Sequence, residues 1–416
     1  MLEVADALAI VLERTKTFQP EAVPLSPALL NRTLAVDAHA DRDSPPFDKS
    51  LRDGYALRSG NYGTELIVIE EIAAGQVPTK AVGRGECSRI FTGAPLPDGA
   101  DAVVMQEDVQ LEGDVVRIGD QRLKPGQWVY PRGSEMKAGE VVLPAGTRLN
   151  SAAIGVLATI GGADVPVFPW PKLSVVATGD ELVPVDAEPG PGQIRNSNGS
   201  MLASLACNAG ADAARGDLLV LLDDDMEAPP QFLEAHLRAH AGNTRLSGPL
   251  IDVLGAVLAQ SDVVLLAGGV SAGKFDLVPG VLERLGVRAH FHKVRMKPGK
   301  PLLFGTFNAT LVFGLPGNPA SAFVCFELFV RPALRKMAGE AETGPRLVPM
   351  PLAEAIAESN DRPTYRPAKL EGGAVPPLPW SGARDLRAMA LADALLVLPA
   401  GESRLDRGMN ANVIVL

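Results

Sequence analysis

The chain has 416 residues, of which 46% are hydrophobic and 21% are charged, so its composition is that of a globular protein and excludes a chain that is disordered throughout. This length is too great for one ordinary core and predicts about two to four domains. The 49 acidic and 39 basic residues give a net charge of −10, which argues against nucleic acid or an anionic membrane surface as the main partner.

Residues 1–18 have the pattern of an amphipathic helix and lack a charged leader before an apolar core, so no signal peptide is predicted. The apolar runs are shorter than the roughly 20 residues needed to span a bilayer. The three cysteines, Cys87, Cys207 and Cys325, lack metal-ligand spacing, which predicts a reducing compartment and buried, inert thiols. We therefore expect a cytoplasmic protein.

The first part of the chain changes character twice. Residues 21–40 are interpreted as a turn and a second helix, whereas residues 63–142 contain short β-prone runs interrupted by Gly, Pro and Asp, typical of an irregular β domain. A helix is predicted from Asn150 or Ser151 to Ile160, packed beside the first helices. Between these parts, residues 45–57 read PPFDKSLRDGYAL, a proline-stiffened polar stretch that on its own is interpreted as a linker.

From Leu173 onward, strand and helix patterns alternate. Strands are predicted near residues 173–178, 216–222, 262–267 and 310–315, with helices between and after them. This alternation predicts a doubly wound parallel α/β domain whose ligand lies at the carboxyl ends of the strands. Residues 241–260 are interpreted as an added loop and helix, and the chain after about residue 336 as a small C-terminal β domain.

Polar clusters follow three of these strands. Asp180 and Glu181 come after the first strand and are interpreted either as a turn with a helix-capping acid or as carboxylates that hold Mg²⁺ beside substrate phosphates. After the strand at 262–267, Gly268, Gly273 and Lys274 have Walker A spacing, but Phe275 replaces the required hydroxyl residue. A P-loop is therefore disfavoured, while Asp276 can offer a carboxylate to a metal; a structural turn is the alternative.

The third cluster is basic. Lys293, Arg295 and Lys297 alternate and are predicted to share one face of a strand, with Lys300 in the following turn. Like charges on one face repel, so either a bound anion or a solvated strand face accounts for them. Residues 316–319, Pro-Gly-Asn-Pro, are predicted to end a strand and begin a helix, where free N–H groups favour an anion.

His236 and His240 lie four residues apart on a predicted helix. This spacing allows a shared metal, but no third ligand is evident, so a surface helix is the favoured interpretation.

Taken together, these motifs resemble the molybdopterin molybdenumtransferase family, which includes the C-terminal half of gephyrin. The resemblance covers most of the chain and rests on PPFDKSLRDGYAL, RIFTGAPLPDGADAVVMQED, VYPRGSEMKAGEVVLPAGTRL, VVATGDEL, GQIRNSNGSML, LLAGGVSAGKFD, VRMKPGKP and GLPGNPASA. It implies an elongated homodimer in which each active site lies between the α/β domain of one subunit and the inserted β domain of the other. It also implies the reaction, in which adenylylated molybdopterin and molybdate give molybdenum cofactor and AMP with Mg²⁺.

The resemblance also implies domain limits and site residues. The expected domains are residues 1–40 with 138–168, an elongated and partly helical part; 41–137, the inserted β domain; 169–334, the α/β domain; and 335–416, a β-barrel-like domain. The implied catalytic residues are Asp53, Thr92, Glu135, Glu181, Asp224 and Asp276. The implied substrate contacts are Gly268, Gly269, Ser271, Lys293, Lys297, Pro316, Asn318, Pro319 and Arg366. The implied Mg²⁺ ligands are Asp180, Glu181 and Asp276.

Within this assignment, Asp53 and Thr92 are expected to come from the partner subunit. Glu135 stands where the family normally has Asp, and residues 241–260 are interpreted as an insertion. Transient contacts with molybdopterin adenylyltransferase and with acceptor molybdoenzymes are expected.

Two other functions fit parts of the sequence. Molybdopterin adenylyltransferase resembles the α/β domain alone, and the residues before Leu173 together with the C-terminal domain disfavour it. A non-enzymatic scaffold, as in the gephyrin branch, is disfavoured because no receptor-clustering linker domain is present.

Overall fold

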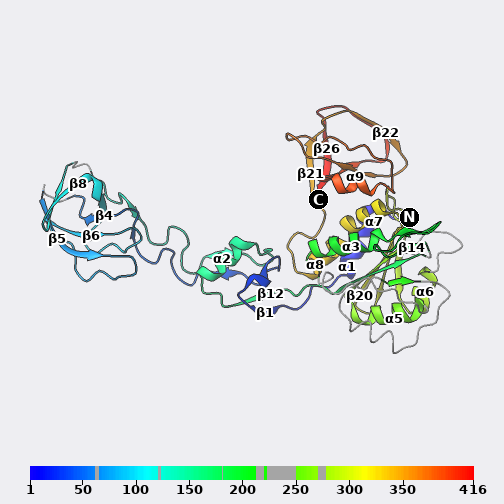
Figure 1. Cartoon of the computed structure of the whole chain (residues 1–416), viewed down its shortest axis with the longest axis horizontal. Coiled ribbons are helices and arrows are strands. Elements are labelled where there is room, and N and C mark those ends of the chain that lie inside the picture. The colour runs from blue at the N-terminus through cyan, green and yellow to red at the C-terminus, as the bar shows by residue number, and fades with distance from the viewer. Residues whose placement is uncertain (61–64, 120–122, 180, 212–219, 223–249, 270–277) are drawn as a thin grey trace.

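The computed structural model describes residues 1–60, 65–119, 123–179, 181–211, 220–222, 250–269 and 278–416. The molecule is elongated, with a β domain at one end, a small middle part, and the α/β and C-terminal domains together at the other end (Figure 1). No helix among these residues is long and apolar enough to cross a membrane.

The first helix, α1, spans Val4–Arg14 as predicted. Its buried residues Ala7 and Val11 pack into the core of the α/β domain. The expected second helix within 21–40 is wrong. That segment contains strand β1 (Glu21–Pro24), a single 3₁₀ turn η1 (Pro27–Leu29) and strand β2 (Ala38–His39), because its prolines remove backbone donors that a helix needs.

The middle part is built from β1, strand β12 (Asp164–Val167) and helix α2 (Ser151–Thr159). Asn150 caps α2 by accepting a hydrogen bond from the backbone N–H of Ala153 at 2.8 Å. The buried residues of α2 pack against Leu29, Leu34 and the neighbouring strands. The expected packing of α2 beside the first helix is therefore wrong, since the two helices belong to different hydrophobic clusters.

A two-stranded connector joins the middle part to the β domain. Strand β2 pairs with β11 (Val141–Leu143), and β3 (Lys49–Ser50) pairs with β10 (Val129–Tyr130), both antiparallel. Between these pairs, Ser44 bridges to Met136, and the Arg132 side chain donates to Asp43 at 2.6 Å. Both passages of the chain through this region are thus tied to each other.

The β domain is a six-stranded sheet in the order β7-β4-β6-β5-β9-β8. Its strands are β4 (Gly54–Leu57), β5 (Glu65–Ile72), β6 (Glu86–Ile90), β7 (Ala102–Met105), β8 (Val109–Glu112) and β9 (Val115–Ile118), with a 3₁₀ turn η2 (Gln106–Asp108) before β8. Alternate residues of β4 point to opposite faces, so Tyr55 and Leu57 join one cluster while Ala56 joins the other.

The α/β domain contains a second six-stranded sheet, in the order β16-β13-β17-β20-β19-β18. Its strands are β13 (Leu173–Thr178), β16 (Val220–Leu222), β17 (Val263–Ala267), β18 (Arg288–His292), β19 (Leu303–Phe307) and β20 (Thr310–Leu315). The first four strands in this order are parallel, which confirms the doubly wound fold class. The sheet is nevertheless mixed, because β19 and β18 extend it antiparallel.

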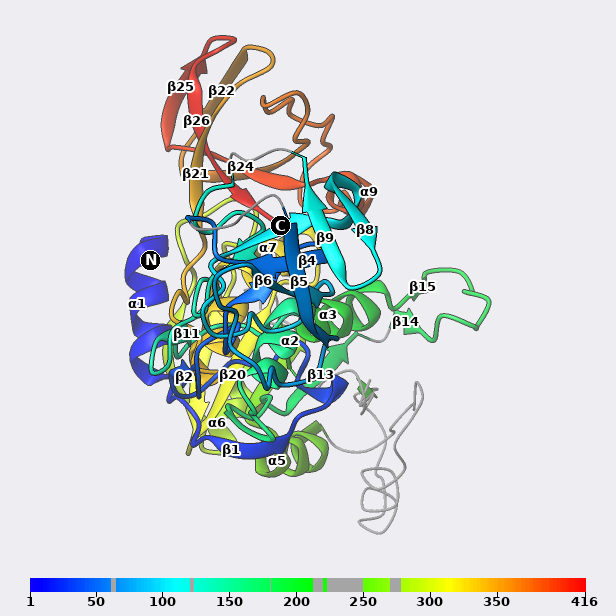
Figure 2. The same ribbon diagram turned by 90° about the vertical axis from the view of Figure 1, so that its left-hand side faces the viewer.

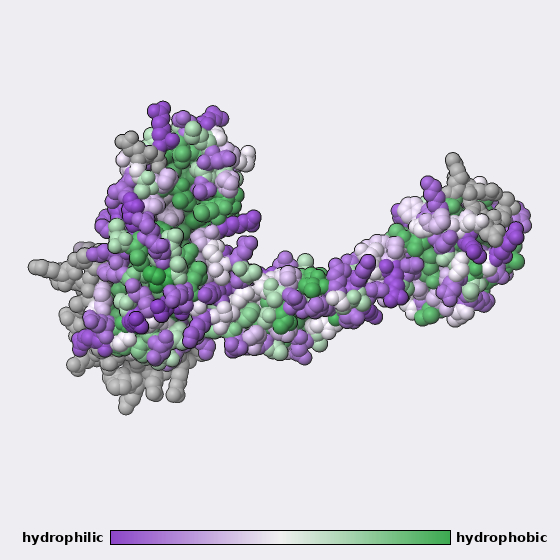
Figure 3. All heavy atoms as spheres, turned by 180° about the vertical axis from the view of Figure 1, so that it is seen from behind, coloured by the Kyte–Doolittle hydropathy of each residue, from purple (hydrophilic) through white to green (hydrophobic). Residues whose placement is uncertain are grey.

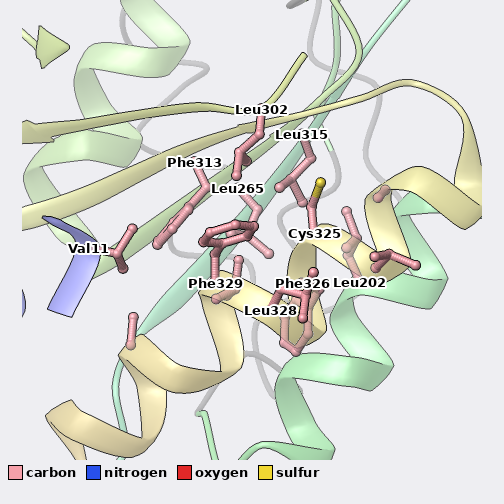
Figure 4. Packing of buried hydrophobic residues seen from close by; sticks show 14 of the residues in the cluster. Val11, Leu202, Leu265, Leu302, Phe313, Leu315, Cys325, Phe326, Leu328 and Phe329 are labelled. Atoms are coloured by element: carbon pink, nitrogen blue, oxygen red, sulfur yellow. The ribbon is translucent and has the colours of Figure 1, made fainter. Parts of the chain in front are cut away.

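Helices cover both faces of this sheet. Their bounds are α3 (Ser197–Asn208), α5 (Leu250–Gln260), α6 (Val278–Arg284), α7 (Pro319–Cys325), the π-helical turn η3 (Phe326–Val330) and α8 (Arg331–Met337). One cluster joins α1, α3 and α7–α8 to the sheet, with Phe313, Phe326 and Phe329 at its centre (Figure 4). The other face packs on α5 and α6.

Two further details correct the sequence interpretation. Residues 250–260, interpreted as part of an insertion, form α5, whose residues Leu254, Val257 and Leu258 are core residues. Of the cysteines, Cys87 and Cys325 are buried, and burial raises the pKa of the Cys87 thiol to about 12. Cys207 is exposed, so the prediction of three buried thiols is wrong at that position.

The C-terminal domain follows α8. Its strands and helix are β21 (Leu347–Pro351), β22 (Ile356–Asn360), β23 (Thr364–Ala368), α9 (Leu386–Leu391), β24 (Ala394–Leu398), β25 (Gly401–Leu405) and β26 (Asn410–Val415). They form a four-stranded sheet, β21-β26-β24-β23, and a separate pair, β22-β25. Figure 3 shows hydrophobic residues gathered along one side of this domain, while hydrophilic residues are spread over the rest of that face.

Candidate functional site

The carboxyl ends of three parallel strands meet where the sequence predicted a ligand. Strand β13 ends at Thr178, β17 at Ala267 and β20 at Leu315. Gly268 follows β17 and donates its backbone N–H to the carbonyl of Leu315 at 3.1 Å. Close by, Gly317 lies so that a Cβ there would be 3.7 Å from the Cα of Gly268. The loops after β17 and β20 therefore lie in contact.

Gly268 and Gly269 cannot be replaced by larger residues without local change. Both have positive φ, +103° and +63°. A Cβ on Gly268 would lie 2.6 Å from the carbonyl oxygen of Thr178, and a Cβ on Gly269 would lie 2.8 Å from Val278 Cγ2. These glycines let the backbone pass close to the end of β13.

Three buried polar atoms at this edge have no hydrogen-bond partner among the described residues: Thr178 Oγ1, Asn196 Nδ2 and Asn198 Oδ1. Asn196 is only 1% exposed and caps α3 through its other amide atom, which accepts from Gly199 N. The amide nitrogen of Asn198 donates to the carbonyl of Gly317 at 2.7 Å. A buried polar atom without a partner is unfavourable by about 1–3 kcal/mol, so this set is suited to a polar ligand with both donors and acceptors.

Sequence reasoning did not single out Thr178, Asn196 or Asn198. The signal available was the pair of asparagines before a predicted helix, but Asn at such a position is ordinarily explained as a cap. Only the fold shows that one amide atom of each asparagine has no hydrogen-bond partner among the described residues.

The remaining residues predicted near this edge divide into two groups. Glu181 is exposed, and its carboxylate lies against Gly179, where a Cβ would be 2.6 Å from Oε2. Pro316 is buried, whereas Asn318 is exposed at the start of α7, with Pro319 as the first helical residue. The predicted site residues Asp180, Asp224, Ser271 and Asp276 lie outside the described residues, as do His236 and His240.

The sequence predicts a strand for the basic segment between β18 and β19, and this prediction is wrong. Lys293 has a positive φ of 79°, and the segment makes only isolated bridges, Leu2 to Val294 and Lys297 to Thr364. The predicted alternation nevertheless holds in burial, because Val294 and Met296 are buried while the basic residues are partly exposed.

Two basic residues of this segment, Arg295 and Lys297, contact the C-terminal domain. Arg295 donates to Glu3 Oε1 at 3.0 Å and to the carbonyl of Asp361 at 2.9 Å. Its guanidinium therefore joins the chain start to the C-terminal domain and is paired with a carboxylate of the same chain. Lys297 reaches the C-terminal domain too, where its Nζ donates to Asn360 Oδ1 at 3.1 Å.

Arg366, on β23, lies beside this contact. Its Nη1 is 3.9 Å from Glu358 Oε2, and its Nε is buried with no hydrogen-bond partner in the described part of the chain. Lys297 and Arg366 thus approach the same carboxylate from two domains, since Lys297 Nζ is 3.8 Å from Glu358 Oε1. The structure brings these two predicted residues together.

Asp53 and Thr92 form a pair in the β domain. The backbone N–H and the hydroxyl of Thr92 both donate to Asp53 Oδ1, at 2.8 and 2.7 Å. These hydrogen bonds hold the pKa of the Asp53 carboxyl below its ordinary value. The pair is far from the strand ends of the α/β domain in the same chain, because the two domains lie at opposite ends of the molecule (Figure 1).

Glu135 lies in the connector rather than with either group. It is exposed, and its Oε2 accepts a hydrogen bond from Ser44 Oγ at 2.8 Å. Among the described residues there is no cluster of three or more His, Cys, Asp or Glu that fits a metal; two of the three predicted Mg²⁺ ligands fall in the undescribed positions.

Comparison with known families gives three consecutive matches. Residues 2–161 match the MoeA N-terminal region (domain I and II), residues 249–336 match a probable molybdopterin binding domain, and residues 349–416 match the MoeA C-terminal region (domain IV). The second match includes all of α5, which again excludes residues 250–260 from an insertion. A further match, to glycosyl transferase family 2 over residues 186–253, lies mostly on undescribed residues and carries no argument.

Relatives and solved structures agree with these matches. A molybdopterin molybdenumtransferase of Staphylococcus aureus (strain COL) is 34% identical over 426 aligned residues, which cover 100% of this chain and 95% of the relative. One from Staphylococcus epidermidis (strain ATCC 12228) is 34% identical over 397 aligned residues, 93% of this chain and 88% of the relative.

The crystal structure of the molybdopterin biosynthesis moeA protein from Pyrococcus horikoshii OT3 has a TM-score of 0.79 and 29% identity, with all of both chains covered. The similarity therefore extends to every domain rather than to the α/β sheet alone. The chain belongs to the molybdopterin molybdenumtransferase family.

Proposed function

We propose that this protein inserts molybdate into adenylylated molybdopterin, releasing AMP, with Mg²⁺ as cofactor. The observation that carries the proposal is the set of buried polar atoms at the end of β13 and at the start of α3 that have no partner among the described residues, in a chain of this family. A hydroxyl, an amide N–H group and an amide carbonyl at one edge match the mixed donors and acceptors of a pterin.

The glycine loop supplies the approach to the phosphates. Gly268 and Gly269 are the proposed contacts of this loop, which packs directly against Thr178 and Val278 because neither glycine carries a side chain. Asp224 and Ser271 are further proposed contacts in this region, with Pro316, Asn318 and Pro319 at the start of α7.

The cations at the junction with the C-terminal domain are proposed to hold oxyanions. Lys297 and Arg366 converge on one place from two domains, and Lys293, four residues before Lys297, is a further proposed contact. Molybdate and the substrate phosphates are both anionic, so the positive charge lowers the energy of bringing them together.

For Mg²⁺, the proposed ligands are Asp180, Glu181 and Asp276. The described member, Glu181, presents its carboxylate at the end of β13, and an all-oxygen set is what Mg²⁺ prefers. When bound, Mg²⁺ supplies positive charge that polarises the pyrophosphate link.

The active site is proposed to form between two copies of the chain. Asp53 and Thr92 lie at the opposite end of the molecule from the strand ends, so they can join one site only if a partner subunit supplies them (Figure 1). Glu135, in the connector, is proposed to act from the same partner. A homodimer in the cytoplasm, meeting molybdopterin adenylyltransferase and acceptor molybdoenzymes transiently, completes the proposal.

The test is release of AMP from adenylylated molybdopterin, measured with and without molybdate and Mg²⁺. Release that needs both supports the proposal. Consumption of ATP to adenylylate molybdopterin, without molybdate-dependent AMP release, would instead indicate the adenylyltransferase.

A further inference from the structure

The junction between the α/β and C-terminal domains contains an anion of its own. Glu358, on β22, lies between the two cations, 3.8 Å from Lys297 Nζ and 3.9 Å from Arg366 Nη1. Both separations are too long for hydrogen bonds, and Glu358 Oε2 is buried without a hydrogen-bond partner among the residues that the structure describes. The carboxylate therefore balances charge here without forming the close, directional contacts of a stabilising ion pair.

Two donors at the same junction also have no acceptor among the described residues. Asn360, only 6% exposed, uses its Oδ1 to accept from Lys297 Nζ, while its Nδ2 is buried without a partner. Arg366 Nε is likewise buried and unpartnered. An oxyanion can accept from both donors, but it gives nothing to the carboxylate of Glu358, which has no proton to donate.

These contacts set two effects against each other. The donors Lys297, Asn360 and Arg366 favour an oxyanion, whereas the like charge of Glu358 beside them opposes it. The cations and Glu358 are only partly exposed, with 24% of the Glu358 side chain and 43% of the Lys297 side chain exposed, so solvent screens this repulsion incompletely.

We propose that Glu358 is an affinity-lowering residue of the oxyanion site, one that offsets part of the positive charge of Lys297 and Arg366 and so weakens binding of molybdate and of competing oxyanions alike. Asn360 is the positioning residue that fixes the direction of Lys297. This inference rests on the proposed oxyanion role of Lys297 and Arg366. It deepens that role by assigning two side chains of β22 opposite effects on oxyanion binding: Glu358 weakens it and Asn360 supports it.

The experiment is a calorimetric titration of sodium molybdate into the full-length protein. Glu358→Gln keeps the side-chain shape and removes the charge, and it is expected to lower the Kd for molybdate about threefold to tenfold. Glu358→Ala, which removes the carboxylate in a different way, is expected to shift the Kd in the same direction. Tighter binding is a result that damage to the fold would not produce.

Two further variants complete the set. Asn360→Asp adds a negative charge where Glu358→Gln removes one, and it is expected to raise the Kd. Glu354→Gln is the matched control, because Glu354 is an exposed carboxylate of the same domain and its loss changes net charge equally; its Kd is expected to equal that of the wild type.

The outcomes separate the two proposals. If Lys297→Ala binds molybdate as tightly as the wild type, the proposed oxyanion site is wrong. If Lys297→Ala weakens binding but both Glu358 variants bind no more tightly than the wild type, only the role of Glu358 is overturned. If neither the wild type nor Glu358→Gln binds molybdate, both proposals fail.

Discussion

The strand ends of the α/β domain and the Asp53–Thr92 pair of the β domain differ in whether their polar atoms have hydrogen-bond partners. At the strand ends, Thr178, Asn196 and Asn198 each keep a buried polar atom without a partner in the described part of the chain. In the β domain, Asp53 receives two hydrogen bonds from Thr92 to one oxygen and remains accessible to solvent. The first arrangement leaves buried polar atoms that no described residue satisfies, whereas the second holds a carboxylate in a fixed direction.

The two regions also differ in how they are stabilised. The α/β sheet is buried on both faces by helices, and one of its clusters extends into α1 and the C-terminal domain. The β domain has two smaller clusters formed from its own strands and the adjoining loops. Each region therefore has a separate core, and changes in one are expected to leave the other folded.

The largest expected effect is at Gly54 in the β domain. A Cβ there would lie 1.9 Å from the backbone oxygen of Val104 on the paired strand β7. We expect Gly54→Ala to lower the free energy of unfolding of the β domain by about 5 kcal/mol, because backbone must separate to make room. Differential scanning calorimetry should show the β-domain transition lost or displaced while the α/β transition is retained.

The control for this experiment is Gly60→Ala, since nothing lies within 4 Å of a Cβ at Gly60. A single transition that shifts as a whole in Gly54→Ala would contradict the separation of the two cores.

The converse change is Phe313→Ala in the α/β core. Phe313 is fully buried and its ring lies 5.0 Å from that of Phe304. We expect a loss of about 3–5 kcal/mol from the α/β domain, from lost burial and the cavity that remains. The β-domain transition in the same calorimetric scan should stay where it is, and a parallel shift of both would argue for one cooperative unit.

A third prediction concerns AMP release and involves one residue of each region. Asp53→Ala and Lys297→Ala, each alone, are expected to reduce AMP release by about 100-fold while remaining folded. When the two variants are mixed and allowed to exchange subunits, about a quarter of the sites regain both residues if each site spans two copies.

Activity recovered on mixing, measured against each variant mixed with itself, therefore tests the shared site. No recovery, with subunit exchange demonstrated by differently tagged chains, would place Asp53 outside it.

The smallest expected effect is on pH dependence. The hydrogen bonds from Thr92 lower the pKa of Asp53 below its ordinary value of 3.8. A lowered folded-state pKa means that the carboxylate stabilises the β domain above pH about 4, and that this contribution is lost as the pH falls through the folded value. The β-domain Tm should therefore be higher in the wild type than in Asp53→Asn at pH 7, and the difference should shrink towards pH 3.

Measurement of both proteins by calorimetry across this range gives the comparison, with Asp114→Asn as a control on an exposed carboxylate of the same domain. A difference that persists unchanged at pH 3 would show that the effect comes from shape rather than charge.

The sequence predicted the buried parallel strands of the α/β domain well, because runs such as residues 263–267 are continuously apolar and bounded by turn residues. The helix predicted at residues 21–40 is wrong, because the prolines there interrupt a helix in spite of the apolar spacing. The antiparallel edge formed by β18 and β19 was also missed. Strand direction at an edge depends on tertiary pairing that no local pattern records.

For the candidate site, the sequence indicated which types of residue are present, but it did not indicate which residues contact one another. Lys293, Arg295 and Lys297 had the same local signal, yet only the fold shows that Arg295 is engaged by Glu3 and Asp361. Glu358 and Asn360 had no signal at all, since their importance comes from meeting Lys297 across two domains. Contacts between segments far apart in sequence require the coordinates.

The connector has one further consequence, for how the chain tolerates changes of length. Its two passages are paired at β2–β11 and at β3–β10 and bridged between them, so they lie side by side along the connector. Seen end on, the β domain lies in front of the rest of the molecule (Figure 2). Residues added to one passage alone would disrupt these pairings. Equal additions to both passages would lengthen the connector and move the β domain outward intact.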